Sequence, residues 1–291
     1  MNALLAWYFV AVWGVGYIAT KIGLQHAPPF TFLSLRFAFG LLCLAPVVLL
    51  LRVRWPATAP EWGHLAVAGL LMHAVQLGGT HYAQHLGMSA GVVAIILASQ
   101  PLVTAVVLAG LLRERIVFGQ WLGIALGLCG VALVVWHKID VREVTLASLA
   151  GTLVGLAGIT AATLYQKRFS PKADLRAAAV IQFAATLAVV TPLALAVEGF
   201  AFTPSWALLG AIAFLVILAS ILGVSAFNLL MRRGESARVT SIMYLPPVFA
   251  VVAELAVFRV VPTLVTMVGM VVTCIGVAMT VWTPRWKSST S

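Results

Sequence analysis

Ten apolar segments of about 20 residues each follow one another along the chain, and this pattern constrains the fold more than any other feature. A helix needs about 20 apolar residues to cross roughly 30 Å of hydrocarbon. Backbone groups in lipid must be hydrogen-bonded within each segment, and no alternating β-barrel pattern is present, so helices are expected. The segments are 4–24, 30–51, 62–83, 88–110, 118–136, 147–168, 174–197, 205–230, 236–257 and 263–283. The sequence therefore predicts an all-α membrane protein with ten transmembrane helices.

The composition excludes most soluble classes of protein. Of the 291 residues, 62% are hydrophobic and 9% are charged, and the mean hydropathy is +1.07. An average soluble domain has roughly 25% charged residues, so an ordinary cytosolic enzyme, a secreted disulfide domain and a disordered chain are excluded. Cys43, Cys129 and Cys274 lie inside apolar segments without a Cys-x-x-Cys motif, which favours small core residues. We expect no metal and no cofactor.

The net charge of +10 would suggest nucleic acid in a soluble protein. Here the basic residues lie between the apolar segments and form no basic stripe, so we expect no nucleic-acid partner. If both termini are cytoplasmic, most of the 18 Lys and Arg residues fall on the cytoplasmic side, as the positive-inside rule requires. The first segment lacks a basic leader and a cleavage site, so it is interpreted as a span. These features predict a multi-pass protein of a bacterial-type inner membrane.

The two halves of the chain are related by a constant offset of 146 residues. Each half contains five spans, so the second copy must enter the membrane from the opposite side. We predict two inverted five-helix repeats, residues 1–140 and 145–286; the alternative is chance matching of apolar residues. Such repeats are typical of transporters that alternate access around a midplane site. The aligned pairs are Lys21 with Lys167, Pro46 with Pro192, Pro101 with Pro247, Arg113 with Arg259, Gly123 with Gly269, and Trp136 with Trp282.

Several short motifs resemble the EamA-type branch of the drug/metabolite transporter superfamily. They are Trp13-Gly14, Lys21, Ala27-Pro28-Pro29, Arg36-Phe37, Gln100-Pro101-Leu102 and Leu112-Arg113-Glu114-Arg115, followed by a glycine-rich fifth span. In the second half, Phe258-Arg259-Val260 replaces the Glu-Arg pair that is usual in the family. The resemblance extends over the whole chain and is greatest to amino-acid exporters of the YddG kind. It implies an exporter of small metabolites with ten spans.

Matching interruptions in spans four and nine predict where a substrate binds. Pro101 and Pro247 lie near the middle of these spans at equivalent positions, and paired helix breaks are a pointer to a transport site. The alternative is that these prolines only shape helix packing. On span three, polar residues at spacings of three and four fall on one face; the eighth span offers Ser220, Ser225 and Asn228. The residues expected to line a central cavity are Trp13, Tyr17, His73, Gln76, Thr80, Tyr82, Ser99, Gln100, Tyr244 and Pro246.

Each of these residues also has a structural interpretation. Ser, Thr and Gln form ordinary interhelical hydrogen bonds in membranes. Trp and Tyr anchor helices at the membrane interface. As cavity walls, the aromatic side chains would suit flat or apolar ligands, including aromatic or branched amino acids, or would hold an organic cation over a ring face.

Arg36 and Glu254 are the ionisable residues whose burial in the membrane needs a reason. They are candidates for an external gate or for proton coupling, while a structural pair, with each other or between Glu254 and Lys21 or Arg259, is the alternative. His81 and His85 could present two nitrogens to a metal, but no further ligand accompanies them. Gly119, Gly123 and Gly127, like Gly151 and Gly155, recur every four residues, which favours packing within a monomer and leaves a dimer open.

Together these features predict a secondary transporter that exports small metabolites, in particular apolar amino acids, by alternating access. An exporter of drugs or organic cations with the same fold is the alternative. Two other classes are a pore without coupling and an intramembrane enzyme, although none of the common hydrolase, diphosphate-binding or phosphate-loop motifs is present. The expected partners are a small-molecule substrate and the lipid bilayer.

Overall fold

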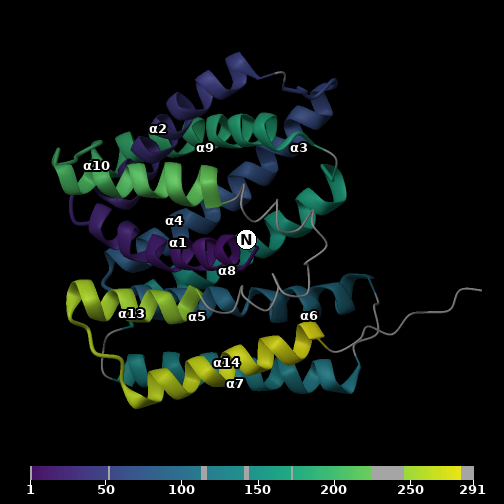
Figure 1. Cartoon of the computed structure of the whole chain (residues 1–291), viewed down its shortest axis with the longest axis vertical. Coiled ribbons are helices and arrows are strands. Elements are labelled where there is room, and N and C mark those ends of the chain that lie inside the picture. Colours follow the sequence, from purple (N-terminus) through teal and green to yellow (C-terminus); the bar gives the residue numbers. More distant parts are fainter. Residues whose placement is uncertain are drawn as a thin grey trace, which may run out of the picture. The chain divides into compact units, whose positions relative to one another are not determined.

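The computed structural model describes residues 2–51, 53–112, 117–140, 144–171, 173–223 and 246–282. These residues form ten helical rods, in the order of the ten predicted spans (Figure 1). Three of the rods are divided. The segments are α1 (Asn2–Gly23), α2 (Pro29–Leu50), α3 (Ala59–Gly69), η1 (Leu70–Val75), α4 (Gln76–His85), α5 (Ala90–Ala98), α6 (Gln100–Leu112), α7 (Phe118–Asp140), α8 (Leu146–Phe169), α9 (Leu175–Glu198), α10 (Trp206–Ala213), η2 (Phe214–Gly223), α13 (Pro246–Phe258) and α14 (Leu264–Trp282).

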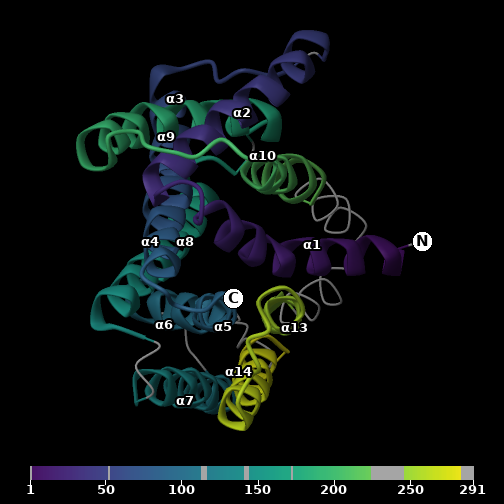
Figure 2. The ribbon, with the colours of Figure 1, turned by 90° about the vertical axis from the view of Figure 1, so that its left-hand side faces the viewer.

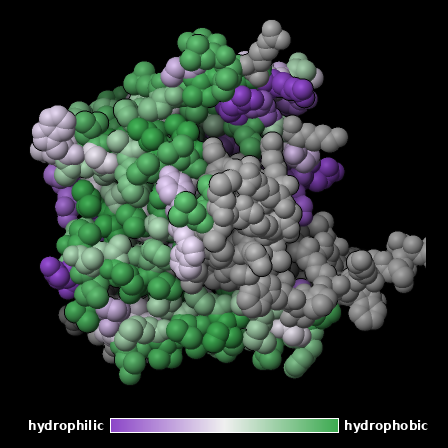
Figure 3. Space-filling model, viewed as in Figure 1, coloured by the Kyte–Doolittle hydropathy of each residue, from purple (hydrophilic) through white to green (hydrophobic). Residues whose placement is uncertain are grey.

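The described surface is suited to lipid. Four rods, 29–50, 146–169, 175–198 and 206–223, are long and apolar enough to cross a membrane. Large apolar side chains are strongly exposed on them, including Leu49 at 84%, Leu50 at 82% and Trp206 at 87%. On the face shown in Figure 3, hydrophobic side chains cover most of the described surface. Because water would penalise such a surface, the prediction of an all-α membrane protein is confirmed.

The chain folds into two compact units, and each unit contains helices from both halves. One unit comprises Met1–Ile18, Met88–Thr145 and Gly223–Ser291. It holds α5, α6, α7, α13 and α14, together with most of α1. The other comprises Ala19–Gly87 and Leu146–Leu222 and holds α2, α3, η1, α4, α8, α9, α10 and nearly all of η2.

Inverted pairing is visible in α2 and α9, which lie side by side in the second unit (Figures 1 and 2). Applying the offset of 146 to Pro29, the first residue of α2, gives Leu175, the first residue of α9. The two helices are antiparallel, because the start of each lies at the end of the other. Glu198 at the end of α9 accepts hydrogen bonds from Phe30 N at 3.0 Å and Thr31 N at 2.7 Å. At the opposite end, Asp174 Oδ2 accepts one from Arg54 N at 3.4 Å.

Local signals in the sequence fix both ends of this pair. Pro29 occupies the first turn of α2, where its missing N–H costs nothing. Helix α9 ends at Glu198 because Gly199 adopts a left-handed conformation, with φ of 63°. Burial alone would raise the pKa of Asp174, but hydrogen bonds from Arg176 and Arg54 outweigh it and hold this pKa below its usual value. The N-cap of α9 is therefore ionised at neutral pH, and its contribution is lost only as the pH falls through that lowered pKa.

The Glu198 cap should contribute measurably to stability. Its carboxylate also accepts from Thr31 Oγ1 at 2.7 Å, so Glu198→Ala removes three charge-assisted hydrogen bonds. We expect a loss of about 2 kcal/mol and a lower melting temperature in detergent. The matched control is Glu61→Ala, since Glu61 caps only the exposed N–H of Ala57. An equal melting temperature for the two variants would contradict the assigned role of Glu198.

In the first unit, α7 and α14 form the equivalent pair across the two halves (Figure 2). Phe118 and Leu264, their first residues, are also related by 146. A Cβ on Gly130 would lie 2.7 Å from Gly269 O, and one on Gly276 would lie 2.6 Å from Gly123 O. The two contacts are equivalent under the repeat, because the offset of 146 relates Gly123 to Gly269 and Gly130 to Gly276. Gly123, Gly127 and Gly130 of α7 are thus occupied by packing within the chain.

Candidate functional site

An aromatic pair lies where α2 crosses α9. Phe37 and Phe183 are related by the offset of 146, and their ring centroids are 5.0 Å apart. Both side chains are buried, with 1% and 7% of their surface exposed. Residues equivalent by an inverted repeat meet only on the local symmetry axis, so this pair marks the axis of the second unit. The neighbouring equivalent pair is Arg36 and Gln182.

Arg36 is a buried cation inside a membrane span. It is 9% exposed, and one of its guanidinium nitrogens donates to Ser220 Oγ at 3.4 Å. Its guanidinium carbon also lies 5.9 Å from the centre of the Phe37 ring. Arginine has five N–H donors and remains charged in proteins. Among the described residues of its own unit, no carboxylate forms an ion pair with it.

His73 and Gln182 complete a polar group around this axis. The His73 ring lies 5.2 Å from the rings of both Phe37 and Phe183. His73 is within hydrogen-bonding reach of Gln182 and within electrostatic range of Arg36. Gln182 is 8% exposed, and its Nε2 has no hydrogen-bond partner. We refer to Arg36, His73, Gln182 and Ser220 as the axial polar cluster.

Two π-helical segments hold His73 and Ser220. His73 lies in η1, after which Gln76 N donates to Leu71 O, and Ser220 lies in η2, where its Oγ donates to Leu215 O at 2.9 Å. The offset maps residues 70–75 of η1 onto 216–221, inside η2. π-Helical turns occur frequently at functional sites. Their recurrence in both halves therefore supports a functional role for this level of the unit.

The predicted site residues of span three lie in the same unit as this cluster. Gln76 and Thr80 are buried, at 8% and 2% exposure, whereas Tyr82 is 42% exposed. Thr80 Oγ1 donates to Gln76 O at 3.0 Å, and its methyl group packs closely over Gly155 of α8. Helix α8 approaches α4 through glycines, including Gly151. The Thr80 methyl group therefore faces α8, and a substrate contact for Gln76, Thr80 or Tyr82 stays a prediction.

The predicted break of span four lies in the first unit. Helix α5 ends at Ala98 and α6 begins at Gln100, with Ser99 between them donating from Oγ to Ile96 O at 2.6 Å. Pro101 is the second residue of α6. Under the offset of 146, Gln100 and Pro101 correspond to Pro246 and Pro247, the first two residues of α13. Tyr244 lies outside the described residues. A substrate contact for Ser99, Gln100 or Pro246 stays a prediction.

Trp13 and Tyr17 lie on α1 in the first unit. Trp13 is 38% exposed and packs on Phe9, with ring centroids 4.9 Å apart. Tyr17 is half-buried. Gly14 brings α1 against α13, since a Cβ there would lie 2.5 Å from the Cβ of Phe249. The predicted place of Trp13 and Tyr17 in the cavity wall stays a prediction.

Glu254 caps a helix in the first unit. It is 3% exposed, and its two carboxylate oxygens accept from Ala90 N at 3.1 Å and Gly91 N at 3.0 Å, at the start of α5. Anions are stabilised at a helix N-terminus by the free N–H groups and by the helix dipole. This geometry gives Glu254 a structural function, and gating or proton coupling stays a prediction.

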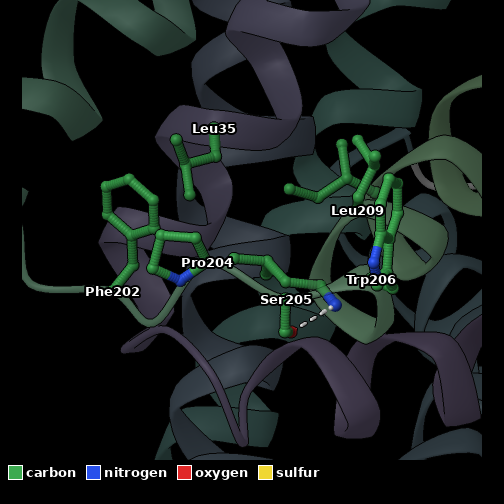
Figure 4. A pocket seen from close by; sticks show the side chains of 8 residues that line it. Leu35, Phe202, Pro204, Ser205, Trp206 and Leu209 are labelled. Atoms are coloured by element: carbon green, nitrogen blue, oxygen red, sulfur yellow. Dashed lines mark hydrogen bonds between the residues drawn. The ribbon is translucent and has the colours of Figure 1, made fainter.

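An apolar groove lies on the second unit between α2 and the start of α10 (Figure 4). Its volume is about 480 Å³. The hydroxyl of Ser205 accepts from Leu208 N at 3.0 Å and caps α10, so it is already engaged. The groove thus has little to orient a polar substrate. Its lining residues are Leu35, Phe202, Pro204, Ser205, Trp206, Leu208, Leu209 and Ile212.

Sequence reasoning missed Gln182 and Phe183. The signal was present, because adding 146 to Arg36 and Phe37 leads to these residues. Without the alignment of the two repeats, one glutamine and one phenylalanine in an apolar segment do not indicate a site. Within the described part of the chain, no group of three or more His, Cys, Asp or Glu residues could hold a metal ion.

The sequence model of the EamA-like transporter family matches residues 1–136 and again residues 142–282. The chain belongs to the EamA-like transporter family. The two matches place one copy of the family unit in each half. The family assignment, the all-helical architecture and the paired helices together make this a transmembrane transporter built from two inverted repeats.

Relatives of this EamA-like chain are transporters. It is 29% identical over 262 residues to the uncharacterized inner membrane transporter YedA of Escherichia coli K12, covering 86% of this chain and 80% of the relative. It is 25% identical over 256 residues to a probable amino-acid metabolite efflux pump of Salmonella typhimurium, covering 85% and 83%. A solved crystal structure is similar in fold, with a TM-score of 0.66, 18% sequence identity and 96% coverage of both chains.

Proposed function

We propose that this EamA-like transporter exports small metabolites, in particular amino acids with apolar side chains, by alternating access. The observation that carries the proposal is the antiparallel packing of equivalent helices, with Phe37 against Phe183 at the crossing of α2 and α9. Two inverted copies that exchange conformations produce an inward-facing and an outward-facing state of the same site. A relative described as a probable amino-acid metabolite efflux pump supports this substrate class.

The proposed setting is an inner membrane, with both termini in the cytoplasm. The distribution of Lys and Arg supports this orientation. Gly123, Gly127 and Gly130 of α7 pack against α14, and Gly151 and Gly155 of α8 pack against α4, which supports a monomeric transporter. The apolar rings beside the axial polar cluster suit ligands with one polar end and an apolar body.

Counterflow in proteoliposomes tests this function. Vesicles containing the purified protein are loaded with unlabelled leucine or phenylalanine, and uptake of the labelled amino acid is measured. We expect trans-stimulation of several fold over empty vesicles, because a carrier returns faster when loaded on both sides. A panel of quaternary ammonium ions, assayed in the same way, tests the organic-cation exporter.

Three outcomes contradict parts of the proposal. Counterflow of the cations without that of amino acids would assign the organic-cation function. Flux without trans-stimulation would assign a pore. Conversion of the labelled compound into a product would assign an enzyme.

A further inference from the structure

The axial polar cluster presents donors without a matching acceptor. Gln182 Nε2 is buried and unpartnered, and the charged guanidinium of Arg36 has one hydrogen bond of 3.4 Å to a neutral hydroxyl. The Ser220 hydroxyl donates its hydrogen to Leu215 O, so its oxygen acts as the acceptor for Arg36. A guanidinium in a membrane-spanning segment costs at least about 2.5 kcal/mol without compensation. The cluster therefore lacks a negative charge.

The carboxylates of the same unit do not supply this charge. Glu198 is engaged at the start of α2, Asp174 at the start of α9, and Glu61 at Ala57 N. Each lies at the end of a rod, whereas Arg36 and Gln182 lie within α2 and α9. The missing anion must come from outside these described residues.

We propose that Arg36 and Gln182 bind the carboxylate of the transported metabolite, and this inference rests on the function proposed above. The guanidinium supplies charge and a fork of two N–H groups, which matches a carboxylate. The amide of Gln182 supplies a further N–H from the symmetry-equivalent position. The rings of Phe37 and Phe183, with centroids 5.0 Å apart and each 5.2 Å from the His73 ring, form the apolar surface beside this polar end.

Ligand-dependent stability of the purified full-length protein tests this site. L-leucine and L-leucinamide are compared, because they differ at the carboxyl group and share the side chain. From the shift in melting temperature with concentration, we expect wild-type protein to bind leucine at least 10-fold more tightly than leucinamide. Arg36→Gln should bring the two affinities within about twofold, a loss of 10- to 100-fold for leucine, typical of a charge-assisted hydrogen bond.

Further variants separate this role from folding. Gln182→Leu, which keeps a similar volume, should weaken leucine binding about 3- to 10-fold. Arg36→Lys keeps the charge, loses the fork and should bind with intermediate affinity. Arg168→Gln, at an exposed arginine of α8, is the matched control and should behave as wild type. If Arg36→Gln does not fold, Gln182→Leu and Arg36→Lys still decide the inference.

Counterflow of leucine, measured in parallel, separates the two proposals. If wild type shows counterflow while Arg36→Gln or Gln182→Leu retains the full preference for leucine over leucinamide, the carboxylate site is wrong and the proposed function stands. If the preference depends on Arg36 but no amino acid shows counterflow, the exporter function is wrong and the anion site stands. Equal stabilisation of wild type by chloride and by leucine at equal concentrations would assign the site to an inorganic anion and overturn the inference.

Discussion

Gly276→Ala is expected to separate α14 from α7 and to lower the stability of the protein by about 3 kcal/mol, the upper end of the cost of overpacking. A Cβ at this position would meet the backbone nitrogen of Gly127, and would lie 2.5 Å from its Cα and 2.6 Å from Gly123 O. Backbone atoms cannot rotate away, so the whole helix must move. The melting temperature in detergent should fall by several degrees, and expression in the membrane should fall with it.

Gly210→Ala is the matched control for this prediction. Gly210 is also a glycine within an apolar helix, α10, but a Cβ there has nothing within 4 Å. This substitution should be neutral, or stabilising by up to about 1 kcal/mol, because alanine favours a helix over glycine. If both variants melt at the same temperature, the close crossing of α7 and α14 is wrong.

Glu254→Ala is expected to cost about 3 kcal/mol, because it leaves the N–H groups of Ala90 and Gly91 without their acceptor at the start of α5. Glu254→Gln keeps one acceptor oxygen, so its melting temperature should lie between those of wild type and Glu254→Ala. Thermal unfolding of the three proteins in one detergent provides the comparison.

The same glutamine variant distinguishes a cap from a proton-coupling group. As a cap alone, Glu254→Gln should support counterflow within about twofold of wild type, with the same dependence on pH. As a coupling group, it should lose the pH dependence of transport, while its melting temperature still lies between those of wild type and Glu254→Ala. This second result would assign Glu254 to coupling and refute a purely structural role.

Some members of the proposed site could be found only by combining the repeat with the fold. Arg36 is conspicuous in the sequence because it is charged within an apolar segment. Gln182 and Phe183 are noticed only because the repeat makes them equivalent to Arg36 and Phe37. Only the packing of the helices shows that Phe37 and Phe183 are in contact. For Thr80, the sequence shows a polar face, but whether that face meets water or a helix depends on the neighbour. The structure shows that the Thr80 methyl group packs against Gly155 of α8.

The sequence by itself determined the ten rods, the division into two repeats and the helix ends at Pro29 and Gly199. These depend on hydropathy, on proline and glycine conformation and on internal similarity, which are all local properties of the chain. Only the tertiary structure decided that each unit draws helices from both halves, that α2 lies against α9, and that Glu254 caps α5. The physical reason is that lipid makes every apolar helix face acceptable, so the choice of neighbour depends on shape and on a few buried hydrogen bonds between residues far apart in the chain.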